Sequence, residues 1–341
     1  MSALPRIPDA RPHDRLGRSL HDLRISVIET CNFRCPYCMP EGQTPEETAI
    51  DRASRLGFDE IETVVRAFAR LGVSKLRLTG GEPLLRKRLP DLVARLAAIP
   101  GIQDLALTTN GSLLAGQARA LREAGLRRLT VSLDALDPAL FKALSGGRGD
   151  IADVLAGIDA AEAAGFRSIK INAVIQRGVN DEQALALAGR FRGTPHVPRF
   201  IEYMDVGTCN GWRREGVVPS AELRDRVAAR WPLRPLVPTY RGEVASRYAY
   251  RDGAGELGFV SSVSEPFCGD CHRARLSADG QLFTCLFAGR GHALRSRIAG
   301  GEEALAEHVA GLWRGRGDRY SEERASVAPD RRKIEMFYIG G

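Results

Sequence analysis

Short apolar segments alternate with segments of helical periodicity over residues 23–203 of this 341-residue chain. The short segments are rich in Leu or β-branched residues and predict buried strands at 23–28, 75–79, 104–108, 128–133, 168–175 and 197–203. Between them, apolar residues at helical spacing predict helices over 58–71, 89–99, 113–124, 151–164 and 181–191. Gly72, Gly125 and Gly165 each end a predicted helix shortly before the next strand. Strands that alternate with helices in this way form a parallel sheet.

About six βα units fit either a doubly wound sheet or a partial barrel. No G-x-G-x-x-G motif follows the first strand, so we favour an α/β fold with an incomplete (β/α)6 barrel of the TIM type. The alternation stops at 207–219, where Gly, Pro, Arg and Asn crowd together. We therefore predict an N-terminal extension (1–22), a partial barrel (23–206) and a C-terminal α+β region (207–341) that closes the barrel mouth.

The C-terminal region has its own pattern. Residues 277–280 carry a turn signal between two short apolar segments, 274–276 and 282–286, which predicts a hairpin. Helical spacing predicts helices over 221–231, 293–298 and 302–313.

The composition, 44% hydrophobic and 27% charged, is that of a folded globular protein. The N-terminus has no signal-peptide core, and no segment approaches the roughly 20 apolar residues of a membrane span, so we expect a cytoplasmic protein without a membrane partner. A net charge of +7 suits a polyanionic partner. No nucleic-acid-binding motif is present, so we expect no nucleic acid. In a reducing compartment the seven cysteines are candidate metal ligands, reactive thiols or buried thiols.

Three cysteines, Cys31, Cys35 and Cys38, follow the first strand at C-x3-C-x2-C spacing. Active sites of barrels and open sheets form at this carboxyl end of the strands. A structural zinc takes four protein ligands, whereas three thiolates can hold three irons of a [4Fe-4S] cluster and leave the fourth iron open. Three unrelated thiols, or a zinc site completed by a distant ligand, are the alternatives.

This spacing, with Tyr37 before the last cysteine, resembles the signature of the radical S-adenosylmethionine (SAM) superfamily. Residues 79–83, Thr-Gly-Gly-Glu-Pro, resemble its GGEP motif. The resemblance implies that SAM chelates the open iron and that an electron from the cluster cleaves its sulfonium, giving a 5′-deoxyadenosyl radical. It also implies a set of positions that contact this cofactor: Tyr37, Gly80, Gly81, Glu82, Ser132, Asp134, Asn172 and Met204.

A second group of cysteines, Cys268, Cys271 and Cys285, has C-x2-C-x13-C spacing. Three interpretations compete. The C-x-x-C-H segment that ends at His272 fits c-type haem attachment, which requires export and leaves Cys285 without a role. Zinc with His272 as fourth ligand is a Cys3His site. A second cluster with an open iron is the third.

Residues 267–280, Phe-Cys-Gly-Asp-Cys-His-Arg-Ala-Arg-Leu-Ser-Ala-Asp-Gly, together with Cys285-Leu286-Phe287, resemble the MoaA family, the GTP 3′,8-cyclases of molybdenum cofactor biosynthesis. The resemblance covers all but about the first twenty residues. It implies a second [4Fe-4S] cluster, held by Cys268, Cys271 and Cys285, whose open iron receives the guanine of GTP. It also implies six positions that contact GTP: Arg24, Arg77, Thr108, Lys170, Arg273 and Arg275. Arg273 and Arg275 alternate on a predicted strand and so face the same side.

The reaction implied by the resemblance is that of a lyase. The radical takes the hydrogen at ribose C3′, C3′ attacks guanine C8, and reduction and protonation give (8S)-3′,8-cyclo-7,8-dihydroguanosine 5′-triphosphate. The terminal Gly340-Gly341 pair is implied to enter the active site and support cyclisation. The implied partners are a MoaC-type cyclic pyranopterin monophosphate synthase, a flavodoxin- or ferredoxin-type reductant and a second copy of the chain in a homodimer.

Two other functions remain open from the residues. One is a different two-cluster radical enzyme, such as one that matures peptides. The other is a basic nucleic-acid-binding protein with structural zinc. Cys209 lies outside both groups of cysteines, and we assign it no role.

Overall fold

The computed structural model describes residues 11–42, 50–326 and 333–340. Within them, a single 12-stranded sheet has the order β12-β11-β10-β1-β2-β3-β4-β5-β6-β9-β8-β7. Its strands are β1 (Asp22–Ser26), β2 (Lys75–Thr79), β3 (Asp104–Thr109), β4 (Arg128–Ser132), β5 (Lys170–Ile175), β6 (Val197–Glu202), β7 (Leu233–Pro235), β8 (Ser246–Tyr250), β9 (Glu256–Val260), β10 (Arg273–Leu276), β11 (Gln281–Phe283) and β12 (His292–Ala293).

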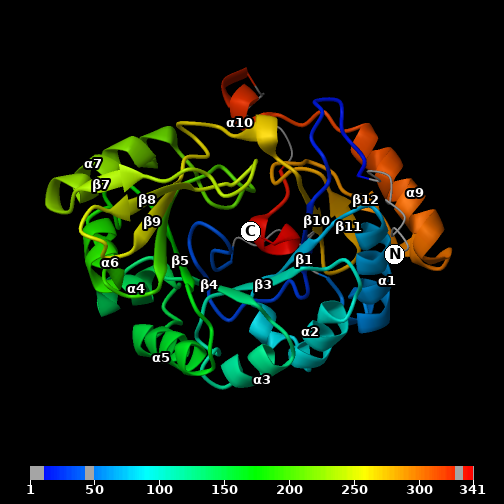
Figure 1. Ribbon diagram of the computed structural model, residues 1–341, viewed down its shortest axis with the longest axis horizontal. Coiled ribbons are helices and arrows are strands. Elements are labelled where there is room, and N and C mark those ends of the chain that lie inside the picture. Colours follow the sequence, from blue (N-terminus) through cyan, green and yellow to red (C-terminus); the bar gives the residue numbers. More distant parts are fainter. Residues whose placement is uncertain (1–10, 43–49, 327–332, 341) are drawn as a thin grey trace, which may run out of the picture.

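The central part of this sheet, from β10 through β1–β6 to β9, is entirely parallel. It curls around an internal space with helices on the outside (Figure 1). The helices are α1 (Phe58–Arg70), α2 (Leu89–Ala97), α3 (Ala118–Glu123), α4 (Pro138–Leu144), α5 (Ile151–Ala163), α6 (Gln183–Phe191), α7 (Ser220–Arg230), α8 (Arg295–Ile298), α9 (Gly301–Arg314), α10 (Tyr320–Glu323) and α11 (Met336–Ile339). The predicted incomplete TIM-type barrel is confirmed.

Alternation along the strands decides what faces the internal space. In β1, Ile25 is fully buried in the core that the outer helices cover and does not line the cavity inside the barrel, whereas Asp22 and Arg24 do. Strand β2 repeats this arrangement in register, with Arg77 opposite Arg24. The barrel interior is therefore polar and cationic, which suits a ligand site better than a packed core.

The six predicted barrel strands and the predicted hairpin are present, the hairpin as antiparallel β10 and β11. The predicted helix over 113–124 is shorter in the structure, because residues 112–117 form turns before α3 begins at Ala118. The prediction missed α4, which Asp137 caps by accepting a hydrogen bond from the amide of Leu140. It also missed β8 and β9, which are joined by a polar and Gly-rich turn.

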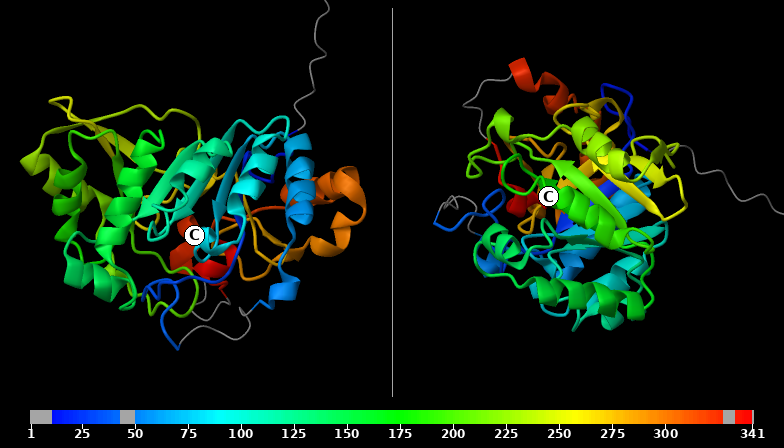
Figure 2. Two further views of the ribbon diagram at one scale, coloured as in Figure 1. Left: turned by 90° about the horizontal axis from the view of Figure 1, so that it is seen from below. Right: turned by 90° about the vertical axis from the view of Figure 1, so that its left-hand side faces the viewer.

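The C-terminal region extends both edges of the barrel sheet. Strand β10 adds in parallel to β1, and β9 adds in parallel to β6. Helix α9 packs beside α1 on the outside, while α11 lies near the centre of the ring (Figures 1 and 2). The predicted boundaries at residues 22 and 206 stay predictions. None of the helices in the described part of the chain has the length and apolarity needed to cross a bilayer.

Candidate active site

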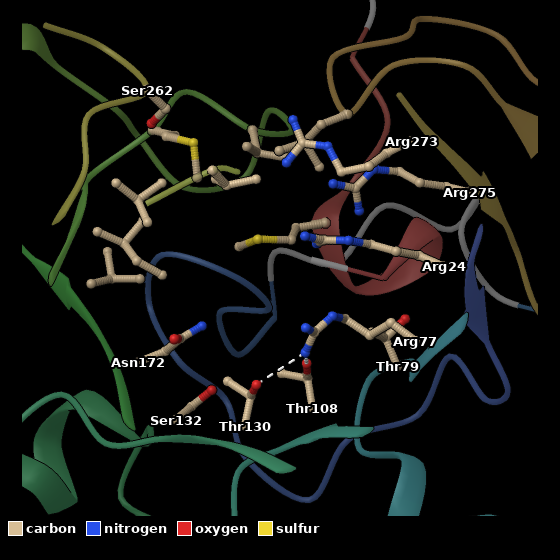
Figure 3. Close-up of a pocket in the computed structure, with 18 of the residues that line it drawn as sticks. Arg24, Arg77, Thr79, Thr108, Thr130, Ser132, Asn172, Ser262, Arg273 and Arg275 are labelled. Atoms are coloured by element: carbon tan, nitrogen blue, oxygen red, sulfur yellow. Dashed lines mark hydrogen bonds between the residues drawn. The ribbon is translucent and has the colours of Figure 1, made fainter. Parts of the chain in front are cut away.

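A cavity of about 340 Å³ occupies the barrel interior (Figure 3). All six cysteines of the two predicted groups line it. The first group follows β1, at the carboxyl ends of the parallel strands. Cys268 and Cys271 precede β10, and Cys285 follows the antiparallel β11, so the second group lies at the amino ends. The two groups therefore face one cavity from opposite ends of the barrel.

The first cysteine loop is positioned by close backbone packing against the segment after β2. The amide of Gly81 donates to the carbonyl of Ile28 at 2.7 Å, and the amide of Glu82 donates to that of Thr30 at 2.9 Å. A Cβ atom at Gly80 or Gly81 would overlap these same backbone atoms of residues 28–30. The two glycines are thus required by the approach of the chain that leads into Cys31, and they also line the cavity.

The thiols of the first group lie in surroundings that favour their neutral form in the absence of a metal. Burial raises the pKa of Cys31 to about 11, and burial followed by nearby acidic groups and thiols raises the pKa of Cys35 and Cys38 further. The amide of Phe33 donates to the Cys31 sulfur at 3.4 Å, a contact of the kind that tunes cluster thiolates.

Tyr37 ties the same loop to the ends of β4 and β5. Its hydroxyl donates to Asp134 Oδ2 at 2.7 Å, and Asp134 Oδ1 accepts from the amide of Val174 at 2.8 Å. Burial raises the pKa of Asp134 to about 6. Ser132, Asn172 and Met204 line the cavity at this end as well.

Glu82 is the predicted cofactor contact that does not line the cavity. Its carboxylate is fully buried and accepts hydrogen bonds from the amides of Leu84 (3.0 Å) and Asn110 (2.7 Å) and from the hydroxyl of Thr109 (2.7 Å). Burial raises its pKa to about 7. In this structure Glu82 joins the turn after β2 to the end of β3.

The second group of cysteines has cationic neighbours. Arg273 Nη2 donates to the Cys271 sulfur at 3.3 Å. Burial alone would raise the pKa of Cys271, but the guanidinium groups of Arg273 and Arg316 outweigh it and lower the pKa to about 6. Burial raises the pKa of Cys285 to about 12. One thiol of this group is thus favoured as a thiolate, the form that binds metal.

Neither group of cysteines has the spacing of a mononuclear zinc site. Tetrahedral Zn–S bonds of about 2.3 Å place the sulfurs about 3.8 Å apart. Among the described residues, the one group of three His, Cys, Asp or Glu side chains with ligand atoms within 4.8 Å of one another is His21, Asp22 and His272. His272 thus lies with Asp22, 3.7 Å from Nδ1 to Oδ1, instead of completing a zinc site with the thiols. Thiols that are not all within 4.8 Å of one another fit a cluster better, because each then binds a different iron.

The His21, Asp22 and His272 group is itself an unfavourable place for a cation. Lys75 Nζ lies 3.6 Å from Asp22 Oδ2. Burial, Arg273, His21 and Lys75 together lower the pKa of His272 against the opposing effect of Asp22. We therefore assign no metal to it.

Cationic side chains converge on the amino end of the barrel. Arg24 is in register with Arg275 on one side and Arg77 on the other, and the three guanidinium groups point into the cavity (Figure 3). Arg77 Nη1 donates to Thr108 Oγ1 at 2.9 Å and to Thr130 Oγ1 at 3.0 Å. Thr108, Lys170 and Arg273 also line the cavity, so all six predicted substrate residues are brought together.

Burial and mutual repulsion destabilise the charges of Lys170, Arg77 and Arg275 when no anion is bound. Burial, with the charges of Arg199 and Arg128, lowers the pKa of Lys170 to about 6. Burial and neighbouring arginines lower the pKa of both Arg77 and Arg275 to about 10. A polyanion in the cavity would relieve this repulsion.

The prediction missed further polar residues of the cavity wall, among them Lys75, Arg128, Thr130 and Arg199. Lys75 and Thr130 lie two positions from Arg77 and Ser132 on the same strands, so the period of two could have identified them. Arg128 forms a bidentate ion pair with Asp104, Nε to Oδ1 at 2.7 Å. Arg199 Nε is buried without a hydrogen-bond partner among the described residues.

The C-terminal tail enters the barrel. Arg275 Nη1 donates to the carbonyl of Gly340. Gly340 has a φ of +74°, and a Cβ atom there would overlap the hydroxyl of Thr79. Met336 and Phe337 line the cavity. Gly341 lies outside the described residues.

The families that this chain matches are consistent with the geometry of the site. The profile of the Radical SAM superfamily matches residues 25–190, and the Molybdenum Cofactor Synthesis C profile matches residues 197–322. Fold, cysteine loop and profile together define a radical SAM protein, whose cofactors are SAM and [4Fe-4S] clusters.

Full-length relatives narrow this class further. A GTP 3′,8-cyclase of Xanthomonas campestris is 64% identical over 338 residues, covering 99% of this chain and 100% of the relative. Those of Acidothermus cellulolyticus and Staphylococcus aureus are 54% and 43% identical over 356 and 335 residues, each covering 96% of this chain and 98% of the relative. The chain therefore belongs to the GTP 3′,8-cyclase family, MoaA, as predicted. The two alternatives, a peptide-maturing radical enzyme and a nucleic-acid-binding protein with structural zinc, are not supported by these relatives.

Proposed function

We propose that this chain converts GTP to (8S)-3′,8-cyclo-7,8-dihydroguanosine 5′-triphosphate, the first step of molybdenum cofactor biosynthesis. The observation that carries the proposal is the placement of both cysteine groups on one cavity, at opposite ends of the barrel strands. One end can then hold the radical source while the other holds the substrate, with the reacting atoms between them.

The carboxyl end is the cofactor end. Cys31, Cys35 and Cys38 would hold the first cluster, and the neighbouring strand ends would contact SAM. When bound, the cluster and SAM supply the one-electron cleavage that begins the radical chemistry. Asn172 Oδ1 is buried, lines the cavity and has no hydrogen-bond partner among the described residues, so it can accept a hydrogen bond from a ligand.

The amino end is the substrate end. Cys268, Cys271 and Cys285 would hold the second cluster, which receives the guanine. The cations Arg24, Arg77, Lys170, Arg273 and Arg275, with Thr108, would bind the rest of the nucleotide. To these we add Lys75, Arg128 and Arg199, because Arg and Lys bind phosphate oxygens and all three face the same space.

The tail and the partners complete the proposal. The entry of Gly340 among the barrel strands supports a role for the Gly340-Gly341 pair in cyclisation. We propose that a flavodoxin- or ferredoxin-type protein reduces the clusters, that a MoaC-type synthase receives the product, and that the chain forms a homodimer. All seven cysteines are free, which suits the reducing cytoplasm.

A single anaerobic assay tests the function. The enzyme is reconstituted to about eight irons per chain and incubated with GTP, SAM and dithionite, and products are separated by liquid chromatography with mass detection. We expect equal amounts of 5′-deoxyadenosine and the cyclised triphosphate. Formation of 5′-deoxyadenosine without any cyclised nucleotide, at full iron content, would overturn the proposal.

A further inference from the structure

The segment that follows β6 forms a receptor for the C-terminal tail. We call residues 205–209 the 205–209 loop. It follows the cavity residue Met204 directly, and Cys209 Sγ contacts the carbonyl of Cys38 at 3.8 Å. The 205–209 loop therefore contacts the first cysteine loop directly.

Glu335 of the tail is inserted into this loop. Glu335 is only 2% exposed. The carboxylate accepts hydrogen bonds from the amide and the hydroxyl of Thr208, both at 2.8 Å, and from the thiol of Cys209 at 2.9 Å. A carboxylate is costly to bury, and these three donors offset that cost.

Gly207 makes the insertion sterically feasible. Its φ is +75°, a region that favours glycine, and a Cβ atom at this position would overlap Glu335 Oε2. The loop is thus shaped around this carboxylate, which a side chain at residue 207 would displace.

A second carboxylate of the loop holds the tail on the N-terminal side of Glu335. Asp205 is 4% exposed and accepts hydrogen bonds from the hydroxyl of Tyr320 (2.5 Å), Arg324 Nε (2.9 Å) and Lys333 Nζ (3.0 Å). Lys333 Nζ also donates to the main-chain carbonyl of Asp205 at 3.2 Å. Lys333, which Asp205 holds in this way, lies two residues before Glu335.

Glu335 immediately precedes α11, and one helical turn then leads to Gly340 at Arg275. Because a single turn is too short to hold its own direction, the contacts on either side of it must fix where Gly340 enters the barrel. Ile339 is fully buried and Tyr338 donates to Asp279 Oδ2 at 2.7 Å, which stabilises the far side of the turn.

We propose that Glu335 is a positioning residue that, through its insertion into the 205–209 loop, places Gly340 in the active site. This inference rests on the proposed function in that it gives the tail a task in cyclisation. The docking of the tail itself does not depend on the reaction.

The test compares Glu335→Ala and Glu335→Gln with the matched control Glu323→Ala, an exposed glutamate of α10. Loss of hydrogen bonds to a buried charge costs about 1.5–3 kcal/mol, or about 10- to 100-fold in the docking equilibrium. We expect hydrogen exchange of residues 336–340 in Glu335→Ala to accelerate by at least about tenfold. The ratio of cyclised product to 5′-deoxyadenosine should fall about as far, with unchanged iron content and KM for SAM.

Two further results separate positioning from general destabilisation. Glu335→Gln keeps a carbonyl that can accept from the Thr208 amide, so it should recover part of the product ratio. In a protein that lacks Gly340 and Gly341, Glu335→Ala should cause no additional loss, because both changes remove the same contribution. A wild-type product ratio in Glu335→Ala, or a loss that adds fully to that of the deletion, would overturn the inference. If the wild-type enzyme formed no cyclised product, the proposed function would be contradicted instead. Hydrogen exchange of residues 336–340 would still show whether Glu335 holds the tail in the 205–209 loop.

Discussion

The two ends of the cavity carry the same number of cysteines in opposite electrostatic surroundings. At the carboxyl end, burial and then the charge of Glu82 raise the pKa of Cys31, and Asp134 lines the wall. At the amino end, Arg273 and Arg316 overcome burial and lower the pKa of Cys271. An acidic end suits a cationic sulfonium cofactor, and a cationic end suits a triphosphate. The surroundings of the cysteines, more than their number, therefore favour the proposed assignment of each ligand to its end.

The strongest test of this division removes one cluster ligand at a time. Cys31→Ala should abolish both SAM cleavage and cyclisation, by about 1,000-fold or more, since no radical source remains. Cys285→Ala should abolish cyclisation equally but keep the reductive formation of 5′-deoxyadenosine. Iron per chain should fall from about eight to about four in each variant. If Cys285→Ala stopped SAM cleavage while the first cluster remained intact, the ends would not be independent.

Charge at the amino end should govern nucleotide affinity alone. Arg199→Gln removes a buried cation of the cavity wall that the sequence analysis missed. We expect the Kd for GTP to rise about 10- to 100-fold, corresponding to about 1.5–3 kcal/mol for a charged hydrogen bond, and the KM for SAM to stay the same. Calorimetry with GTP in the absence of reductant measures this. The matched control is Arg167→Gln, an exposed arginine that does not line the cavity, and an equal effect of both variants would contradict the assignment.

Local patterns in the sequence were sufficient for the parts of this site that lie close together along the chain. Spacing alone singled out the two cysteine groups and placed Arg273 and Arg275 on one face of a strand, whereas the ligand of each group was implied only by the family resemblance. Arg199 could not be singled out in the same way, because any one arginine is usually at the surface. It faces the barrel interior only because β6 pairs with β5 and β9, and the sequence does not report this pairing.

Side-chain direction and tertiary partners were also beyond the sequence. Its motif placed Glu82 near the cofactor, but only the fold shows that its carboxylate is turned toward the amides of Leu84 and Asn110. The contact between Glu335 and Thr208 joins segments 127 residues apart, and no periodicity reports such a pair.

Lys170 gives the amino end a pH dependence above about pH 7.5, where Glu82 and Asp134 of the carboxyl end are already largely ionised. Its pKa is lowered to about 6 from 10.5 by burial and by the charges of Arg199 and Arg128. Without a nucleotide, Lys170 is therefore largely deprotonated above that pH. A bound triphosphate raises the pKa of Lys170 again, so GTP binding is accompanied by uptake of a proton. GTP affinity should fall as pH rises, by up to about tenfold per unit for one coupled proton.

The window from about pH 7.5 to 9 is suitable because a terminal phosphate, with a pKa near 6, is already ionised there. Calorimetry in two buffers of different ionisation enthalpy should show net proton uptake. Lys170→Arg, which stays charged, should flatten the profile. A Kd that does not change with pH in the wild-type protein would show that Lys170 is not coupled to the nucleotide.

The smallest expected effect comes from one hydroxyl at each end. Tyr37 donates to Asp134 at the carboxyl end, and Tyr240 lies at the amino end with its hydroxyl 2.9 Å from Lys75 Nζ. Each Tyr→Phe change removes one hydrogen bond and retains the ring, at a cost of about 1 kcal/mol or about fivefold in affinity. Tyr37→Phe should raise the KM for SAM only, because Asp134 keeps its bond from Val174 but loses orientation. Tyr240→Phe should weaken GTP only. Each variant is the control for the other, and a Tyr37→Phe enzyme that lost GTP affinity as much as SAM affinity would show that the two ends respond as one site.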